Sequence, residues 1–273
     1  MAKRVNSRKS ILAIVFIGII ALWLQTIPSP SSAGNKLRQS AVKVYSQILE
    51  EERTILVSLP DGYESAEKSY PVLYILDAEG ETLFPKCIST VMDLNKKDLA
   101  PEMIVVGIWN TDRNRDMIPE AVSHRPGSGG SKNFLNFIKQ ELMPYIQKNY
   151  HASDYSMLFG MSNSALFAVY ALLEKPTTFK AYIASSPMIG HCPDYMHNKA
   201  EAFIEKNHLN GKLLYMIYGS EDSHRVTAYV PNFQNYLNSH APEGFSSKLE
   251  ILDGEGHVPD GSLFRGLQFI FNH

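Results

Sequence analysis

Short strand-like runs, several of them nearly continuous in apolar residues, alternate with helical patterns along most of this chain, and this alternation limits the folds that it can adopt. The runs cover residues 70–80, 103–110, 155–160, 179–187, 212–222 and 245–257. A strand buried on both faces is continuously apolar, as it is when helices cover both sides of a parallel sheet. The intervening segments are helical in pattern, and 133–150 carries its apolar side chains on one face. The sequence therefore predicts an α/β fold with a mostly parallel central sheet and helices on both faces.

The remaining segments carry other patterns. Residues 42–59 contain two alternating strand-like runs separated by acidic residues, which predict an antiparallel pair at an edge of the sheet. Segment 111–131 predicts a polar loop, 188–211 predicts mixed structure, and 224–240 predicts one helix. No internal repeat, charge block or long linker interrupts residues 34–273, so we expect a single domain without a large cap.

The first 33 residues have the pattern of an export signal. Four basic residues precede an uncharged apolar run of 14 residues, Ile11–Leu24, and a segment rich in proline and serine follows. This order is typical of a secretory signal peptide, here with cleavage after Ala33. The run is short for a membrane span, which needs about 20 apolar residues, and an uncleaved N-terminal anchor is the alternative. We expect residues 1–33 to be a signal peptide or anchor, and the protein to be periplasmic or secreted, or anchored to the inner membrane.

Residues 155–173, YSMLFGMSNSALFAVYALL, read as a buried strand, a sharp turn and a helix with Ser162 at the turn. Such a turn raises a serine hydroxyl above the sheet, next to the first N–H groups of the helix. The nucleophile elbow is written G-x-S-x-G, and Ser164 stands where its second glycine is expected. Because Ser164 is small, close packing of strand and helix is retained. Ser162 is a candidate nucleophile, although a serine that only caps a helix is the simpler alternative.

A base and an acid follow Ser162 in the order found in α/β-hydrolases, which is serine, acid, histidine. His257 comes just after the last predicted strand and can accept the Ser162 proton and later protonate the leaving group. A carboxylate would fix its tautomer, and the adjacent Glu221 and Asp222 both follow the preceding strand. We favour Asp222 and keep Glu221 as the alternative.

An ester-cleaving site also needs two preorganised backbone N–H groups for the developing negative charge. One is expected from Asn163, the residue after Ser162. The other is expected from the loop after the strand that ends at Asp77, either from Glu79 or from Ala78.

Composition excludes some classes of function. A net charge of −2 gives no reason to expect a nucleic-acid partner. The spacing of His191, Asp194 and His197 matches no strong zinc pattern, so no metal and no organic cofactor is implied. Cys87 and Cys192 are the only cysteines, and they are either a disulfide of an exported protein or two buried small apolar residues.

Several blocks in order resemble the esterase family of α/β-hydrolases that includes enterochelin and salmochelin esterases, S-formylglutathione hydrolase, feruloyl esterase modules and mycolyltransferases. The blocks are YPVLYILDAEGETLFP, IVVGIWNTDRNRDMIP, FIKQELMPYIQKNY, LFGMSNSALFAVYALLEKP and EGEGH. The resemblance covers roughly residues 40–273. It implies an α/β-hydrolase esterase domain with Ser162 as nucleophile, His257 as base and Asp222 as acid, although some siderophore esterases of this group use a Ser–His dyad. It also implies Glu79 as an oxyanion donor.

Two departures from the family pattern bear on substrate preference. The common H-S-x-G-G turn is here Met161-Ser162-Asn163-Ser164-Ala165, and the common D-G after the strand is Asp77-Ala78. Arg113 and Arg115, in the predicted loop 111–131, are candidates for binding an anionic or polyhydroxy substrate. Internal salt bridges within that loop are the competing interpretation of both arginines.

We interpret the chain as an exported serine hydrolase that cleaves a small-molecule carboxylic ester, siderophore-type or small acyl, through an acyl-enzyme. Acyl transfer to a sugar or lipid by the same triad is one alternative. A non-catalytic binding protein on a hydrolase fold is another. No nucleic acid is expected to bind, and contact with a membrane is expected only through an uncleaved N-terminal segment.

Overall fold

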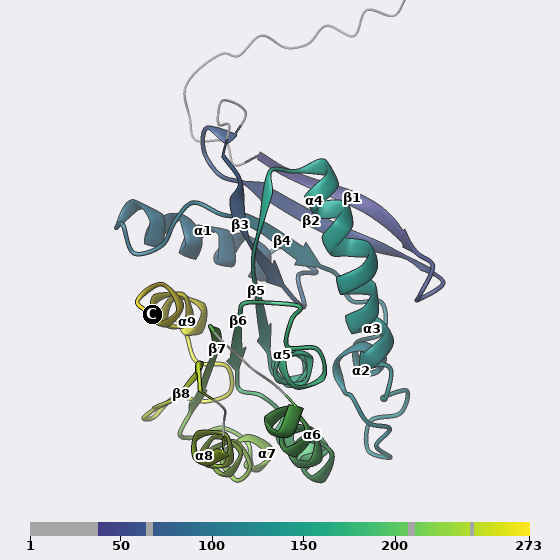
Figure 1. Ribbon diagram of the computed structural model, residues 1–273, viewed down its shortest axis with the longest axis vertical. Helices are drawn as coiled ribbons and strands as arrows, with labels where there is room; N and C mark the ends of the chain where they lie inside the picture. Colours follow the sequence, from purple (N-terminus) through teal and green to yellow (C-terminus); the bar gives the residue numbers. More distant parts are fainter. Residues whose placement is uncertain (1–37, 64–67, 207–210, 241–242) are drawn as a thin grey trace, which may run out of the picture. The chain divides into compact units, whose positions relative to one another are not determined.

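The computed structural model describes residues 38–63, 68–206, 211–240 and 243–273, and within them one eight-stranded sheet has the order β1-β2-β4-β3-β5-β6-β7-β8 (Figure 1). The strands are β1 (Arg38–Ser46), β2 (Glu51–Leu59), β3 (Tyr70–Ile75), β4 (Ile104–Ile108), β5 (Ala152–Met161), β6 (Ala181–Ser185), β7 (Lys212–Gly219) and β8 (Phe245–Leu252). The pairs β1–β2 and β2–β4 are antiparallel, and all other pairs are parallel. The predicted α/β fold and the antiparallel edge pair are therefore confirmed.

Helices cover both faces of this sheet, because successive side chains of each inner strand point to opposite sides. Leu73 and Ile75 of β3 pack in one apolar cluster with α1 (Leu83–Lys96) and α9 (Ser262–Phe271), which lie together in Figure 1. Tyr74 faces the other cluster, which contains the remaining large helices. Those helices are α3 (Ser131–Phe137), α4 (Met143–Asn149), α5 (Asn163–Glu174), α6 (Pro193–Lys206) and α8 (Val230–His240).

The structure differs from four of the segment predictions. Segment 188–211, expected to be mixed, contains a 3-10 turn, Ile189–His191, and the 14-residue helix α6, which Pro193 begins. The helix expected over 224–240 is divided into α7 (His224–Thr227) and α8, with Pro231 near the start of the second piece. A proline has no N–H to donate, so it is tolerated in a first turn and not in a helix interior.

The other two differences are smaller. The predicted loop 111–131 includes one short helix, α2 (Arg113–Met117), which the Asp112 carboxylate caps by accepting the Arg115 N–H. The helix predicted over 133–150 is continuous but passes through a π-helical segment, Ile138–Leu142, between α3 and α4. Pro144 follows this segment, and its missing N–H interrupts the regular ladder at that point.

The described residues all belong to one compact unit, Lys36–His273. The predicted export signal or anchor, residues 1–33, lies outside the described residues. No helix in the described part of the chain is long and apolar enough to cross a membrane. Cys87 and Cys192 are both free and buried, which agrees with their interpretation as small apolar core residues.

Candidate active site

Ser162 lies between β5 and α5 with backbone angles of φ 61° and ψ −118°. A non-glycine residue in this region of φ/ψ space is strained by about 1–3 kcal/mol and persists only where its surroundings hold it there. Its N–H donates to Ser185 O at 2.8 Å, and its carbonyl accepts the Leu166 N–H at 3.1 Å. The predicted turn between strand and helix is therefore present, with Ser162 at its most strained residue.

Gly160 makes this turn sterically feasible. A Cβ on Gly160 would lie 2.2 Å from Ser164 O, in the first turn of α5. Ser164, Ala165 and Ala168 are completely buried, so small residues line the contact between α5 and the end of β5. The close packing predicted for this turn is retained even though Ser164 replaces a glycine.

His257 and Asp222 form a hydrogen-bonded pair at the ends of β8 and β7. His257 Nδ1 lies 2.7 Å from Asp222 Oδ1, and the same oxygen accepts the Ser223 N–H at 2.6 Å. A carboxylate only accepts hydrogen bonds, so Nδ1 carries a proton, and in the neutral imidazole Nε2 then has the lone pair. The Asp222 side chain is fully buried, whereas 40% of the His257 side chain is exposed.

Of the two adjacent acids, only Asp222 contacts His257 within the described residues. Glu221 is exposed, and its N–H donates to Glu255 O at 2.9 Å. That bond joins the β7 loop to the loop that carries His257. A Cβ on Gly219 would lie 2.0 Å from Glu255 O, so the same two loops also touch at a glycine.

The end of β6 joins the two halves of the site. Ser162 N–H donates to Ser185 O, and the next residue, Ser186, accepts the Val258 N–H through Oγ at 2.8 Å. Ser162 and His257 are thus each held next to neighbouring residues of one strand end. Among the described residues no hydrogen bond joins Ser162 Oγ to His257. Such bonds are often long in a free enzyme and tighten when substrate binds.

One oxyanion donor is expected from Asn163, and the other from either Ala78 or Glu79, whose N–H groups differ in whether they already have a partner. Asn163 begins α5 and is 4% exposed. Ala78 N–H is already bound to Ile108 O at 3.2 Å, whereas Glu79 N–H has no partner in the described part of the chain. The geometry therefore favours Glu79 over Ala78 as the residue with a free donor after β3.

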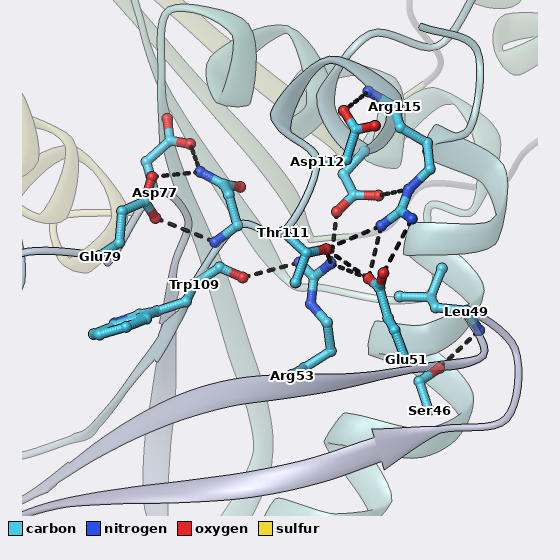
Figure 2. A network of polar contacts seen from close by, with 12 residues as sticks. Ser46, Leu49, Glu51, Arg53, Asp77, Glu79, Trp109, Thr111, Asp112 and Arg115 are labelled. Atoms are coloured by element: carbon cyan, nitrogen blue, oxygen red, sulfur yellow. Dashed lines mark hydrogen bonds and ion pairs between the residues drawn. The ribbon is translucent and has the colours of Figure 1, made fainter. Parts of the chain in front are cut away.

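Asp77, which precedes Ala78 and Glu79, accepts hydrogen bonds from three side chains of two segments. Arg113 donates to it from Nε at 2.9 Å and from Nη2 at 2.7 Å. Asn110 Nδ2 donates at 2.6 Å, and the same amide group bonds the Glu79 carboxylate at 2.8 Å (Figure 2). Ser164 Oγ completes the set at 2.7 Å. Sequence reasoning placed Asp77 at a strand end and missed its part in this network.

Arg113 and Arg115, the two candidates for substrate binding, both make internal ion pairs. The Arg113 side chain remains 38% exposed beside Asp77. Arg115 lies between Glu51 and Asp116, and their hydrogen bonds raise its pKa, while Arg115 lowers the pKa of Glu51 to about 2 (Figure 2). Of the two arginines, Arg113 is the one next to the candidate oxyanion donors.

Arg53 of β2 contacts the segment that follows β4. It is fully buried, it pairs with Asp116 at 2.7 Å, and it donates to Trp109 O at 2.9 Å (Figure 2). It also lies over the rings of Phe134 and Phe137. The segment that carries Asn110 and Arg113 is therefore attached to β2 by a buried cation.

Two histidines that the sequence did not assign to this site lie beside Asn163: His191 contacts Asn163, and His124 contacts His191. His191 Nε2 lies 3.1 Å from Asn163 Oδ1, and His191 Nδ1 lies 2.9 Å from His124 Nε2. Burial, with the charges of Arg125 and His124, lowers the pKa of His191 to about 4. Neutral His191 donates from Nε2 to the amide oxygen and accepts at Nδ1 from exposed His124. In the described residues no three His, Cys, Asp or Glu side chains gather as a metal site.

The chain is similar to known esterases in sequence and in structure. The model of the family described as "Putative esterase" matches residues 46–263. A ferri-bacillibactin esterase, BesA of Bacillus subtilis, is 26% identical over 69% of this chain and 74% of its own length. A siderophore triacetylfusarinine C esterase of Aspergillus fumigatus is 32% identical over 58% of this chain and 64% of its own.

A solved structure of a serine hydrolase is also similar to this chain. An IroE-like serine hydrolase from Shewanella oneidensis superposes with a TM-score of 0.78 at 26% identity, and the match covers 86% of this chain and 80% of that one.

Proposed function

Because this chain belongs to that esterase family and is a serine carboxylic-ester hydrolase, we propose that it cleaves its substrate through an acyl-enzyme on Ser162, with His257 as base and Asp222 as acid. One arrangement carries the proposal. Ser162 has the strained conformation of a nucleophile at a strand–helix turn, and the buried Asp222 carboxylate holds His257 with a free lone pair at Nε2. The three residues follow the carboxyl ends of β5, β7 and β8, at the edge of the sheet where chemistry gathers in folds of this kind.

The reaction follows from these groups. His257 Nε2 takes the proton of Ser162 Oγ as that oxygen attacks the ester carbonyl. The negative charge that develops on the carbonyl oxygen is stabilised by the N–H groups of Asn163 and Glu79. The bond between the acyl carbon and the alcohol oxygen breaks, and His257 returns the proton to that departing oxygen. A water molecule then repeats the same steps on the acyl-enzyme and releases the carboxylic acid.

The assignment of the acid rests on contact. Asp222 Oδ1 is 2.7 Å from His257 Nδ1, and Glu221 uses its backbone instead to support the loop. Asp222 fixes the tautomer that leaves Nε2 unprotonated and stabilises the imidazolium that forms during the reaction.

For the substrate we propose an ester of the siderophore type. Two relatives are named as esterases of ferri-bacillibactin and of triacetylfusarinine C, and the second name calls its substrate a siderophore. The half-exposed Arg113 guanidinium lies on the Asp77 side of the site and is suited to an anionic group of such a ligand.

We also propose that residues 1–33 direct export and that residues 34–273 form the esterase domain, which would act in the periplasm or outside the cell. Fractionation of producing cells followed by mass spectrometry of the N-terminus tests this. A mature N-terminus at Gly34 supports cleavage, an intact N-terminus in the membrane fraction supports an anchor, and intact cytoplasmic protein contradicts export.

The purified chain should react with a fluorophosphonate, which labels only activated serines. We expect one adduct, at Ser162, that the Ser162→Ala variant lacks, and hydrolysis of a panel of esters that the same variant abolishes. A folded protein that leaves Ser162 unlabelled and cleaves no ester would contradict the proposal. Products formed with added alcohols or sugars would separate hydrolysis from acyl transfer.

A further inference from the structure

The serine that replaces the second glycine of the elbow is completely buried and fully hydrogen-bonded. Ser164 Oγ accepts the Met161 N–H at 2.8 Å and lies 2.7 Å from Asp77 Oδ2 and 2.8 Å from Met161 O. Its single proton can go to one of those two oxygens at a time. The Asp77 carboxylate is the stronger acceptor, because a hydrogen bond to an ionised group is roughly twice as strong as a neutral one.

Asp77 sits in a conformation that needs such support. Its φ is 56°, in the left-handed region that an aspartate adopts only at some cost. Arg113, Asn110 and Ser164 donate four hydrogen bonds to its two oxygens, which is about the full accepting capacity of a carboxylate. Two of these residues come from the segment after β4, and only Ser164 comes from the elbow.

The bond from Ser164 to Asp77 joins the two candidate oxyanion donors. Asn163 directly precedes Ser164, and Glu79 follows Asp77 by two residues. One donor is therefore fixed to one end of this hydrogen bond and the other donor to its other end, although residues 77 and 164 are 87 positions apart. A glycine at position 164 would give the same close packing without this direct bond, although Arg113 Nη2, which pairs with Asp77, would still donate to Met161 O of the elbow at 3.3 Å.

We propose that Ser164 is a positioning residue that sets the spacing of the Asn163 and Glu79 N–H groups through its hydrogen bond to Asp77. The inference rests on the proposed function, since it needs a negative charge to develop between those donors. An oxyanion hole stabilises the transition state more than the bound substrate, so a change in its spacing lowers kcat and leaves KM little changed.

The test compares Ser164→Ala and Ser164→Gly with the unaltered chain on a neutral ester and on its thionoester, in which sulfur replaces the carbonyl oxygen. We expect kcat on the ester to fall about tenfold in both variants, with KM within about twofold. The thionoester makes poor use of the hole, so its rate should change little and the ester-to-thionoester ratio should fall. The matched control is Ser156→Ala, a buried serine in the middle of β5, which should behave as the unaltered chain does.

A second arm tests the route of the effect. In an Asp77→Asn background, Ser164→Ala should lower the ratio no further, because the acceptor that Ser164 acts through is already weakened. An additive effect would overturn the inference. So would an unchanged ratio in both Ser164 variants, or equal losses on ester and thionoester.

Failure of the proposed function gives a different result. If the unaltered chain cleaves no ester and Ser162 takes no fluorophosphonate, the proposed function is overturned and the inference with it. If Ser162→Ala is inactive and both Ser164 variants match the unaltered chain, only the inference fails. Circular dichroism and thermal unfolding establish whether each variant is folded. If Ser164→Ala does not fold, Ser164→Gly takes its place in the test.

Discussion

The two halves of the candidate site are built in different ways. The nucleophile half consists of β5 and α5, and every residue of α5 up to Leu173 is buried. The acid–base half consists of the loops after β7 and β8, where residues 253–257 are all exposed and β8 itself is an edge strand. One half is held by packing and by a dense set of hydrogen bonds, and the other by a few hydrogen bonds and one close contact at Gly219.

This difference fits the chemistry assigned to each half. A strained nucleophile and two fixed N–H donors gain from a rigid, buried support, because preorganised dipoles need no rearrangement during the reaction. A histidine that moves protons between serine, alcohol and water needs access to solvent. Its orientation comes instead from one buried carboxylate, Asp222. Errors of position in the first half should therefore affect both stability and activity, and errors in the second should affect activity more than stability.

The largest expected effect lies in the acid–base half. Asp222→Asn should lower kcat about 10⁴-fold, because an amide favours the wrong tautomer of His257. Thermal unfolding should change little by comparison. Steady-state kinetics on a neutral ester measures the loss.

Glu221→Gln is the matched control, since it changes the adjacent acid, which is exposed and bonds only through its backbone. Its kcat should stay within about twofold of the unaltered chain. A large loss in this variant together with a small one in Asp222→Asn would reverse the assignment of the acid. Small losses in both would indicate a Ser–His dyad.

Alanine substitutions of two glycines test directly whether the two halves of the site differ in rigidity. In Gly160→Ala the new Cβ meets Ser164 O at 2.2 Å inside the packed half, and in Gly219→Ala it meets Glu255 O at 2.0 Å in the exposed loop. Gly160→Ala should lose about 3 kcal/mol of unfolding free energy or more, because neither β5 nor α5 can move away. Gly219→Ala should lose only about 1 kcal/mol, since the loop can shift, but that shift displaces His257.

Urea unfolding and kcat of the same two variants distinguish these outcomes. The contrast holds if Gly219→Ala loses more activity than stability and Gly160→Ala loses much of both. Equal losses of stability would show that the loop after β8 is as firmly held as the elbow.

The sequence predicted the packed half better than it predicted the contacts within the site. Continuous apolar runs identify strands such as β5 because burial on both faces leaves no room for polar side chains. Helix α6 was missed although its buried residues Met196, Ala200 and Phe203 have the spacing of one helix face, because most residues between them are polar. The order of Ser162, Asp222 and His257 could be read because strand ends meet at one edge of a parallel sheet.

There is a physical reason why the residues that orient the site could not be predicted from the sequence. Ser164 and Asp77, like Asn163 and His191, are joined by side-chain bonds between segments far apart in sequence. No local pattern encodes the register that brings such atoms within hydrogen-bonding distance. The residues of a site can therefore be predicted from their strand ends, and the groups that orient them need the folded chain.

His191 provides a pH test of the buried half. Its pKa is lowered to about 4, whereas a histidine in the unfolded chain titrates near 6.5. Between these values the unfolded chain binds a proton that the folded one does not, so stability falls as the pH falls from about 6.5 to about 4. Above about 6.5 the contribution is complete, and the total change is at most about 3 kcal/mol.

Urea unfolding at several pH values from 7 to 4 measures this loss in the unaltered chain and in His191→Gln, which keeps a donor for Asn163. The variant should lose less stability on acidification. His240→Gln, at an exposed position on α8, is the control and should follow the unaltered chain. Parallel curves for all three proteins would mean that His191 titrates normally and is not held in its neutral form.

The smallest expected effect concerns Arg113, which lies between the packed network and solvent. If its exposed face binds an anionic group of the substrate, Arg113→Ala should raise KM several-fold for an anionic ester and leave KM unchanged for a neutral one. If it serves only to hold Asp77, the variant should lower kcat equally on both esters, since the oxyanion donors shift for any substrate. Arg113→Lys separates the two contributions, because lysine keeps the charge but cannot make the bidentate contact with Asp77. If Arg113→Ala leaves KM for the anionic ester unchanged, Arg113 serves only to hold Asp77. If Arg113→Ala raises that KM and Arg113→Lys restores it, the positive charge at position 113 also binds the substrate.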